Sequence, residues 1–197
     1  MGNREWLCER AIFAPTNEIV AQINEKNMSQ VEGSITEYLS VDTVMDNEQV
    51  TSYPVEFLNS LEMSGVPSHK LRLKIGVLVL SMRNLNTTRL CNGARLEITH
   101  LGSNIVLLTG IARGENVLIP RIPIIPIDLP FQFKRLQFPS KLALGMTINK
   151  AQGQTLKVAC VHLEKPCLSH GQLYVACSRV SSPQNLYIPA KNVKQKI

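Results

Sequence analysis

The stretch from Met146 to Thr155, which reads MTINKAQGQT, constrains the fold of this chain more than any other. A short apolar run, Leu142 to Leu144, leads into it, and polar residues with one Lys and one Gly follow. An apolar strand that ends in this way resembles the phosphate-handling edge of an α/β sheet, where ligands sit at the carboxyl ends of strands. About twenty residues later, GQLYVACSRV (171–180) places an arginine at the end of a short helical pattern.

The two ends of the chain both alternate strand and helix patterns. Residues 11–14 are apolar and end at Pro15, and Thr16 can cap a helix whose apolar face carries Ile19, Val20 and Ile23. The C-terminal part again alternates strand and helix patterns. It predicts strands at 141–148, 158–163 and 185–188, and a helix from a Ser169 N-cap to about Arg179 with Leu173, Ala176 and Cys177 on one face. This pattern favours an α/β domain with a parallel sheet.

The middle of the chain has a different pattern of apolar and turn residues. Residues 31–68 have weak periodicity and several turn residues, which predicts a long loop with a short helical piece near 55–61. From Leu71 to Ile119, short apolar runs are separated by turn signals such as Asn92-Gly93, which predicts a small barrel of short strands. The following run IPRIPIIPIDLP holds four prolines, so an extended strap outside any sheet is expected there.

Charge is distributed unevenly along the chain. No Lys or Arg occurs between Lys26 and Lys70, whereas that stretch holds seven acidic residues. The remainder carries only eight acidic residues against 21 Lys and Arg. A basic surface of this size favours a polyanionic partner, although it is also compatible with a surface that is merely basic and soluble.

Metal and membrane chemistry are disfavoured by the residue pattern. The five cysteines include no C-x-x-C pair, so a zinc site is not expected, and Cys160 and His162 are read as neighbours on one face of a strand. Reduced, mostly buried thiols of a cytosolic or nuclear protein are the expected state. No apolar stretch reaches the length of a membrane span, so no membrane partner is expected.

Taken together, MTINKAQGQT and GQLYVACSRV resemble motifs V and VI of superfamily 1 helicases. The resemblance is to the PIF-type (superfamily 1B) ATP-dependent DNA helicases, especially the version carried by Helitron transposons. Further segments resemble the same family, in the same order along the chain. The motif IV region is resembled by ERAIFAPTNEIVAQIN (9–24), and the opening of the inserted barrel by LRLKIGVLVLSMRNLN (71–86) with CNGARL (91–96). The return into the motor domain is resembled by LPFQFKRLQFPSKLALGMTINKAQGQT (129–155).

The resemblance implies a RecA-like second motor lobe with an inserted SH3-like β-barrel. The boundaries expected from it are residues 1–70 for the start of the lobe with an acidic loop at 31–68, 71–136 for the barrel, and 137–197 for the remainder with motifs V and VI. No G-x-x-x-x-G-K-[ST] phosphate loop and no Walker B-like acidic pair occurs in the sequence. The chain is therefore expected to be the C-terminal half of a motor, either cut from a longer protein or produced by a degenerate gene.

Three residues are candidates for the nucleotide side of the site. The resemblance implies that ATP and Mg²⁺ bind between two lobes and that motif VI supplies an arginine finger, which in this chain is Arg179. Guanidinium suits a γ-phosphate because it stays charged and can bond two oxygens at once. Gln152 and Gly153 are the other expected ATP contacts, since a glycine lets the backbone approach phosphate closely. Without the first lobe, this chain is expected to bind no nucleotide cofactor and to hydrolyse no ATP.

Single-stranded DNA is the expected polyanion. Thr147, Asn149 and Lys150 are assigned to its backbone, because hydroxyl, amide and ammonium groups commonly contact phosphates. The family usually has His at Asn149 and often Ser at Ala151, so these two positions depart from its pattern. Basic residues of the barrel and of its exit are further candidates for contacts with single-stranded DNA. The first two are Arg83 and Arg95, and the others are Arg89, Arg113, Arg121, Lys134 and Arg135. Phe131, Phe133 and Phe138 are stacking candidates, with packing of the strap as the favoured alternative.

Two function classes remain open from the sequence. The first is the motor half of a 5′-to-3′ DNA helicase whose missing N-terminal RecA-like lobe lies in the same or a separate chain. The second is a stand-alone nucleic-acid-binding or regulatory module without ATPase activity. A structural relic that binds nothing is a third reading, supported by the acidic segment and the absent phosphate loop.

Overall fold

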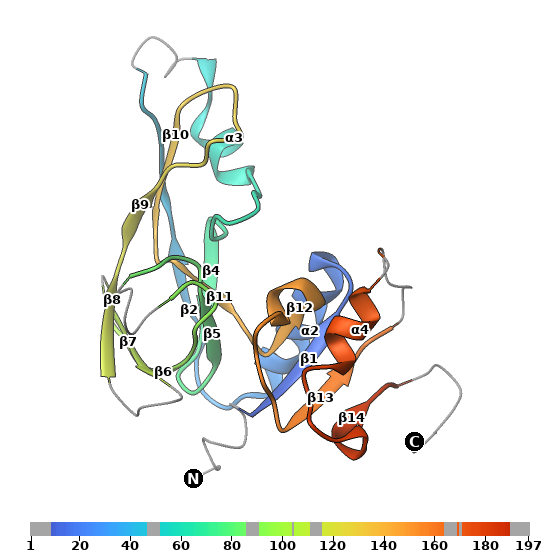
Figure 1. Cartoon of the computed structure of the whole chain (residues 1–197). Helices are drawn as coiled ribbons and strands as arrows, with labels where there is room; N and C mark the ends of the chain where they lie inside the picture. The colour runs from blue at the N-terminus through green and yellow to red at the C-terminus, as the bar shows by residue number, and fades with distance from the viewer. Residues whose placement is uncertain are drawn as a thin grey trace. The chain divides into compact units, whose positions relative to one another are not determined.

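The computed structural model describes residues 9–46, 52–85, 91–103, 105–110, 116–163, 169 and 171–189, with backbone only at 105 and 107–110. The chain forms two compact units (Figure 1). The first joins Met1–Glu32 to Leu142–Ile197, and the second is Gly33–Lys141. The second unit thus begins well before the 71–136 range expected from the sequence.

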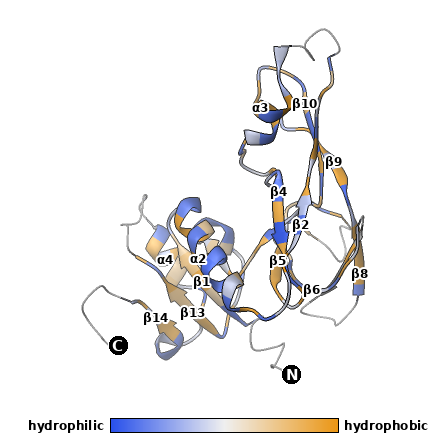
Figure 2. Cartoon of the chain, turned by 180° about the vertical axis from the view of Figure 1, so that it is seen from behind, coloured by the Kyte–Doolittle hydropathy of each residue, from blue (hydrophilic) through white to orange (hydrophobic). Residues whose placement is uncertain are grey.

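The first unit contains a parallel sheet of the α/β kind predicted. Its order is β12-β1-β13-β14, and each neighbouring pair is parallel. The strands are β1 (Arg10–Ala14), β12 (Gly145–Thr147), β13 (Val158–Val161) and β14 (Leu186–Tyr187). Phe13, Ala159 and Val161 have no exposed surface, and Figure 2 shows the hydrophobic colour over β1 and β13. Such continuous apolar runs are typical of strands buried on both faces.

Helix α2 (Asn17–Gln30) follows β1 as expected. The Thr16 hydroxyl caps it by accepting a hydrogen bond from the Ile19 backbone N–H at 3.4 Å, which confirms the predicted start. Ile19 and Val20 are buried, and Ile23 packs beside them. The hydrophilic colour covers much of the rest of the helix in Figure 2. The predicted apolar stripe is therefore the face that covers the sheet.

A buried asparagine ties α2 to the start of β12. The Asn24 side chain accepts from the Gly145 N–H at 2.6 Å and donates to the Gly145 and Leu142 carbonyls at 3.1 and 3.3 Å. The helix approaches the strand so closely that a Cβ added at Gly145 would lie 2.8 Å from Ile23 Cγ2. Only glycine fits between the helix and the strand at this point.

We expect Gly145→Ala to lower the free energy of unfolding by about 1–3 kcal/mol, the usual cost of forcing an extra carbon into a packed site. Urea unfolding followed by circular dichroism measures this loss. The double variant Ile23→Ala/Gly145→Ala removes the clashing methyl group, so its loss should be smaller than the sum of the two single losses. Additive losses would contradict the steric account.

The second unit is built from antiparallel strands. A five-stranded sheet has the order β11-β5-β6-β7-β8. Its strands are β5 (Leu78–Ser81), β6 (Arg95–Leu101), β7 (Ile105–Gly110), β8 (Asn116–Pro120) and β11 (Ser140–Leu142). The short strands and turns predicted from Leu71 onward are therefore present. Among the described residues the pairing runs from β11 to β8 without closing on itself, so the SH3-like barrel stays a prediction.

The acidic segment is not the loop that was expected. It contains β2 (Thr36–Leu39), β3 (Val41–Val44) and α3 (Val55–Ser60), and only α3 was predicted. Strand β2 pairs with β4 (Lys70–Leu73), and β3 pairs with β10 (Phe133–Gln137). The partner of β3 lies some ninety residues away, so no local pattern marks this strand.

Part of the proline-rich strap also belongs to a sheet. Strand β9 (Ile122–Ile124) pairs with β10, and Pro123 stands opposite Leu136. The prediction that this run stays outside any sheet was wrong for these residues. The three-stranded order β3-β10-β9 places β9 at an edge, where a proline without an N–H is tolerated.

Candidate functional site

The polar cluster of residues 147–155 follows the carboxyl end of β12, next to the end of β1. Ala14 stands opposite Thr147 in the parallel pairing, so the two strands end side by side. A 3₁₀ helix, η2 (Ile148–Ala151), begins there. Ile148 and Ala151 are fully buried, whereas Asn149 and Lys150 are exposed. Packing of the two apolar residues thus presents the polar pair to solvent at the edge where ligands bind in such sheets.

Helix α4 (Gln172–Cys177) packs against η2 through a shared core. Ala176 is fully buried and clusters with Ile148 and Ala151. The predicted Ser169 cap was wrong, because the helix begins after Gly171, whose left-handed φ of 80° reverses the chain. The predicted apolar face was wrong in part, since Leu173 is 43% exposed and Gln172 is buried in its place.

Arg179 lies just beyond α4 and folds back onto residues of both motifs. Its Nε donates to the Val175 carbonyl at 3.0 Å, and its Nη2 donates to the Ser178 hydroxyl at 2.8 Å. Its Nη1 donates to the Gln154 carbonyl at 3.4 Å. The backbone reinforces this contact, because the Leu156 N–H donates to the Arg179 carbonyl at 2.9 Å. The structure therefore brings the predicted finger arginine against the end of the polar cluster.

The other predicted nucleotide contacts lie in the exposed turn beside Arg179. Gln152 and Gly153 are both exposed, and Gly153 has a φ of +82° that side chains other than glycine rarely adopt. The predicted DNA contacts Asn149 and Lys150 are at the opposite end of the same short segment, with Thr147 half-buried just before them. One continuous segment thus presents both groups of predicted site residues.

Gln172 is a member of this site that the sequence reasoning missed. Its side chain is only 5% exposed, and its Nε2 lies 3.5 Å from the Pro15 carbonyl and 3.5 Å from Asn149 Oδ1. The signal in the sequence was its spacing, because a polar residue four positions before Ala176 falls on the buried face of the helix.

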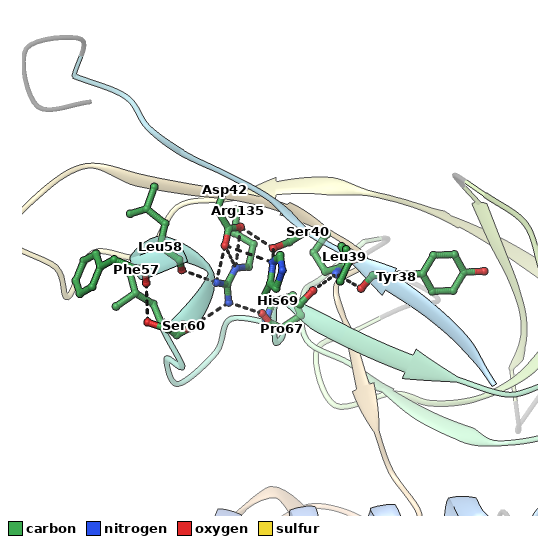
Figure 3. Close-up of polar contacts among 12 residues, drawn as sticks. Tyr38, Leu39, Ser40, Asp42, Phe57, Leu58, Ser60, Pro67, His69 and Arg135 are labelled. Atoms are coloured by element: carbon green, nitrogen blue, oxygen red, sulfur yellow. Dashed lines mark hydrogen bonds and ion pairs between the residues drawn. The ribbon is translucent and has the colours of Figure 1, made fainter. Parts of the chain in front are cut away.

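Arg135 is a structural residue and not a surface contact for DNA. Its side chain has no exposed surface, and its guanidinium forms an ion pair with Asp42 at 2.7 Å. It also donates to the carbonyls of Leu58, Leu61 and Pro67 at 3.0–3.1 Å (Figure 3). The prediction that it lines the channel exit was wrong, because a positive charge in sequence does not reveal a buried acidic partner in β3.

The same carboxylate connects Arg135 to two further polar side chains. The Ser40 hydroxyl donates to Asp42 Oδ1 at 2.7 Å and lies 2.8 Å from His69 Nδ1 (Figure 3). Although the residue types are those of a hydrolytic triad, the serine proton is directed at the carboxylate, and the carboxylate is held by Arg135. The cluster therefore joins Ser40, at the junction of β2 and β3, to His69 and to Arg135 on β10.

The remaining basic candidates of the second unit differ in exposure. Arg83 is exposed, and Arg95 and Lys134 are half-buried. Arg121 donates to the Leu39 carbonyl at 2.7 Å, and its guanidinium lies 5.3 Å from the Phe138 ring. Arg89 and Arg113 fall outside the described residues. Of the described members of this set, only Arg83 is exposed to solvent.

The three phenylalanines have the packing role that was favoured for them. Phe131 is 8% exposed, and Phe133 and Phe138 are fully buried. Phe131 stacks on Tyr53 with ring centroids 4.1 Å apart. Their rings therefore join the strap to β10 and α3 and leave little surface for stacking bases.

The cysteine and membrane expectations concern residues away from this site. Burial raises the pKa of the Cys160 thiol above its usual value, which favours the protonated form. Within the part of the chain that the structure describes, no three His, Cys, Asp or Glu side chains gather as metal ligands would. The same residues include no helix long and apolar enough to cross a membrane.

Known proteins that are similar in sequence to this chain are DNA helicases. A family model described as the 2B domain of the DNA helicase Pif1 matches residues 56–101. The chain is 31% identical to the ATP-dependent DNA helicase PIF6 of Trypanosoma brucei brucei over 61% of its own length and 16% of that protein. It is 29% identical to human ATP-dependent DNA helicase PIF1 over 86% of its own length and 25% of that protein. The chain thus spans a quarter or less of the length of these two relatives.

Solved structures share the fold. The Pif1 helicase of Candida albicans superposes with a TM-score of 0.73 at 24% identity, over 93% of this chain and 45% of that one. The Bacteroides Pif1 structure described as bound to single-stranded DNA gives 0.71 at 23% identity, over 93% and 41%. This likeness supports a RecA-like α/β fold for the first unit.

Proposed function

Because this chain is a relative of part of the PIF-type DNA helicases, we propose that it is the C-terminal motor half of such an enzyme. The complete enzyme couples ATP hydrolysis to 5′-to-3′ movement along single-stranded DNA and to unwinding. The phosphate loop and the Mg²⁺ ligands come from an N-terminal RecA-like lobe, in the same or a separate chain. The names of the relatives support ATP use, and one neighbour is described as a complex with ADP-AlF3 and single-stranded DNA.

The contact between Arg179 and Gln154 carries this proposal. It sets a guanidinium beside the exposed turn of Gln152 and Gly153, at the edge of a parallel sheet. Phosphoryl transfer is accelerated mainly by positioning and by charge stabilisation, and an arginine supplied by a second lobe is a recurring part of that stabilisation. Arg179 therefore serves as the finger, and Gln152 and Gly153 approach the nucleotide.

The DNA side of the proposal uses Thr147, Asn149 and Lys150 together with the second unit. The sheet β11-β5-β6-β7-β8 forms the inserted SH3-like barrel, and Arg83 and Arg95 contribute charge to a single-strand channel. The family match over residues 56–101 supports this assignment, since it includes β5 and β6.

We expect the chain to bind single-stranded DNA weakly, with little sequence preference and a marked salt dependence. Each neutralised phosphate should contribute about 0.7 to the slope of log affinity against log salt concentration. Lys150→Ala should lower that slope by less than one unit and weaken all sequences alike. The measurement is a salt titration of fluorescence anisotropy on mixed-sequence and homopolymer strands.

Lys26→Ala is the matched control for this experiment. Lys26 is exposed on α2, outside the polar cluster, and its replacement changes the net charge by the same amount. It should leave the slope unchanged. Binding that ignores salt, or that strongly prefers one sequence, would count against backbone tracking and favour a specific-recognition module.

The alternative function is a stand-alone nucleic-acid-binding module without ATPase activity. One observation favours it: Nε, Nη1 and Nη2 of Arg179 all donate to acceptors of this chain. Addition of a matching first lobe separates the two functions, because a motor half then supports DNA-stimulated ATP hydrolysis and a binding module does not.

A further inference from the structure

Helix α4 and Arg179, the second residue after it, contact the polar segment 149–154 at both of its ends. At one end, Gln172 Nε2 lies 3.5 Å from Asn149 Oδ1. At the other end, Arg179 Nη1 lies 3.4 Å from the Gln154 carbonyl. Between these two contacts, Ala176 packs on Ala151 in the shared core. The helix thus spans the segment that carries both groups of proposed ligand contacts.

The Gln172 amide is buried between two carbonyl oxygens. The side chain is 5% exposed, and its Nε2 reaches the Pro15 carbonyl after β1 and Asn149 Oδ1 after β12. An amide nitrogen has two hydrogens, so it can serve both acceptors. A buried donor that loses an acceptor is destabilised, because no water replaces that acceptor. Movement of Asn149 away from this position therefore breaks the contact between Asn149 Oδ1 and the Gln172 amide.

We propose that Gln172 is a positioning residue that couples the DNA contact Asn149 to the nucleotide contact Arg179. This inference rests on the proposed function, because it takes its two ligands from there. When DNA draws the Asn149 amide toward a phosphate, Gln172 loses an acceptor and the start of α4 shifts. Since Val175 lies on the same short helix, the shift moves the carbonyl that accepts from Arg179 Nε.

The coupling can be measured on this chain alone by nuclear magnetic resonance. The Arg179 Nε–H donates to the Val175 carbonyl and gives a side-chain signal that Arg179→Lys identifies by its loss. Oligothymidylate is titrated into ¹⁵N-labelled protein, and the Asn149 side-chain amide and the Arg179 Nε–H are followed together. In the unaltered chain, we expect both signals to shift with the same apparent dissociation constant.

Gln172→Leu removes the link and keeps the size of the side chain. In this variant, the Asn149 signal should still shift on DNA addition and the Arg179 shift should be lost. Leu173→Ala is the matched control on the same helix, because Leu173 is 43% exposed, and it should keep both shifts. If Gln172→Leu folds poorly, Asn149→Ala breaks the same contact from its exposed side and should also abolish the Arg179 shift while Lys150 retains DNA binding.

The outcomes separate the coupling from the function on which it rests. If no signal responds to DNA, the proposed DNA-binding function fails and the coupling fails with it. If Asn149 responds and Arg179 does not, or if Arg179 responds equally in Gln172→Leu, the proposed function stands and the coupling is overturned. Loss of the Arg179 response in Gln172→Leu alone, with the control intact, establishes Gln172 as the link.

Discussion

Arg135→Met should lower the free energy of unfolding of the second unit by about 3–5 kcal/mol, the usual loss when one partner of a buried ion pair is removed. The variant leaves the Asp42 carboxylate buried opposite an apolar side chain. It also removes the donors that serve the carbonyls of Leu58, Leu61 and Pro67. Because a small domain has only about 5–15 kcal/mol of net stability, this loss should shift the urea midpoint of unfolding markedly downward.

Urea unfolding and native-state hydrogen exchange of the β10 amides measure this loss. Lys134→Met is the matched control, since it removes a half-buried positive charge from the next position of the same strand and should cost far less. The double variant Asp42→Leu/Arg135→Met should recover only part of the stability, because the three carbonyl acceptors stay without donors. A single variant as stable as the unaltered chain would show that the buried network contributes little.

Arg179→Lys should lower ATP turnover by about 10³–10⁵ in the complete enzyme, as the loss of finger arginines does in related phosphoryl-transfer systems. Lysine keeps the charge but cannot bond two phosphate oxygens as a planar fork. It also cannot reproduce the three contacts that orient the guanidinium. Affinity for DNA should stay nearly intact, because the proposed DNA contacts lie at the other end of the polar segment.

This chain combined with a matching first lobe is the sample for that experiment. ATP hydrolysis with and without single-stranded DNA is compared with anisotropy of the same strand. Arg72→Lys is the control, because Arg72 lies on β4 in the second unit, is assigned to neither ligand, and its charge is retained. A fall in DNA affinity with unchanged turnover would place Arg179 in the DNA channel instead.

Deletion within residues 32–62 is a poor test of the acidic segment, because these residues contain β2, β3 and α3 and include Asp42. Single exposed acids, such as Glu56 on α3, are the appropriate targets if repulsion of DNA is to be measured.

The sequence by itself determined the features that depend on neighbouring residues. The Thr16 cap and the apolar spacing of Ile19 and Val20 predicted α2. The single strand expected over 141–148 was wrong in part, because this range is divided between β11 (Ser140–Leu142) and β12 (Gly145–Thr147), which belong to different sheets. The order of MTINKAQGQT and GQLYVACSRV was enough to indicate the family. Such signals are local, because a helix or a buried strand requires a characteristic spacing of apolar residues within its own segment.

Tertiary structure alone decided which polar residues are buried and which strands pair over long separations. Arg135 reads as a surface charge until β3 brings Asp42 beside it, and no neighbouring residue in the sequence marks that partner. Strands β3 and β10 are brought together by hydrogen bonds between residues some ninety positions apart. The physical reason is that the energy of a buried charge or an edge strand depends on its partner, and the identity of that partner is absent from the local sequence.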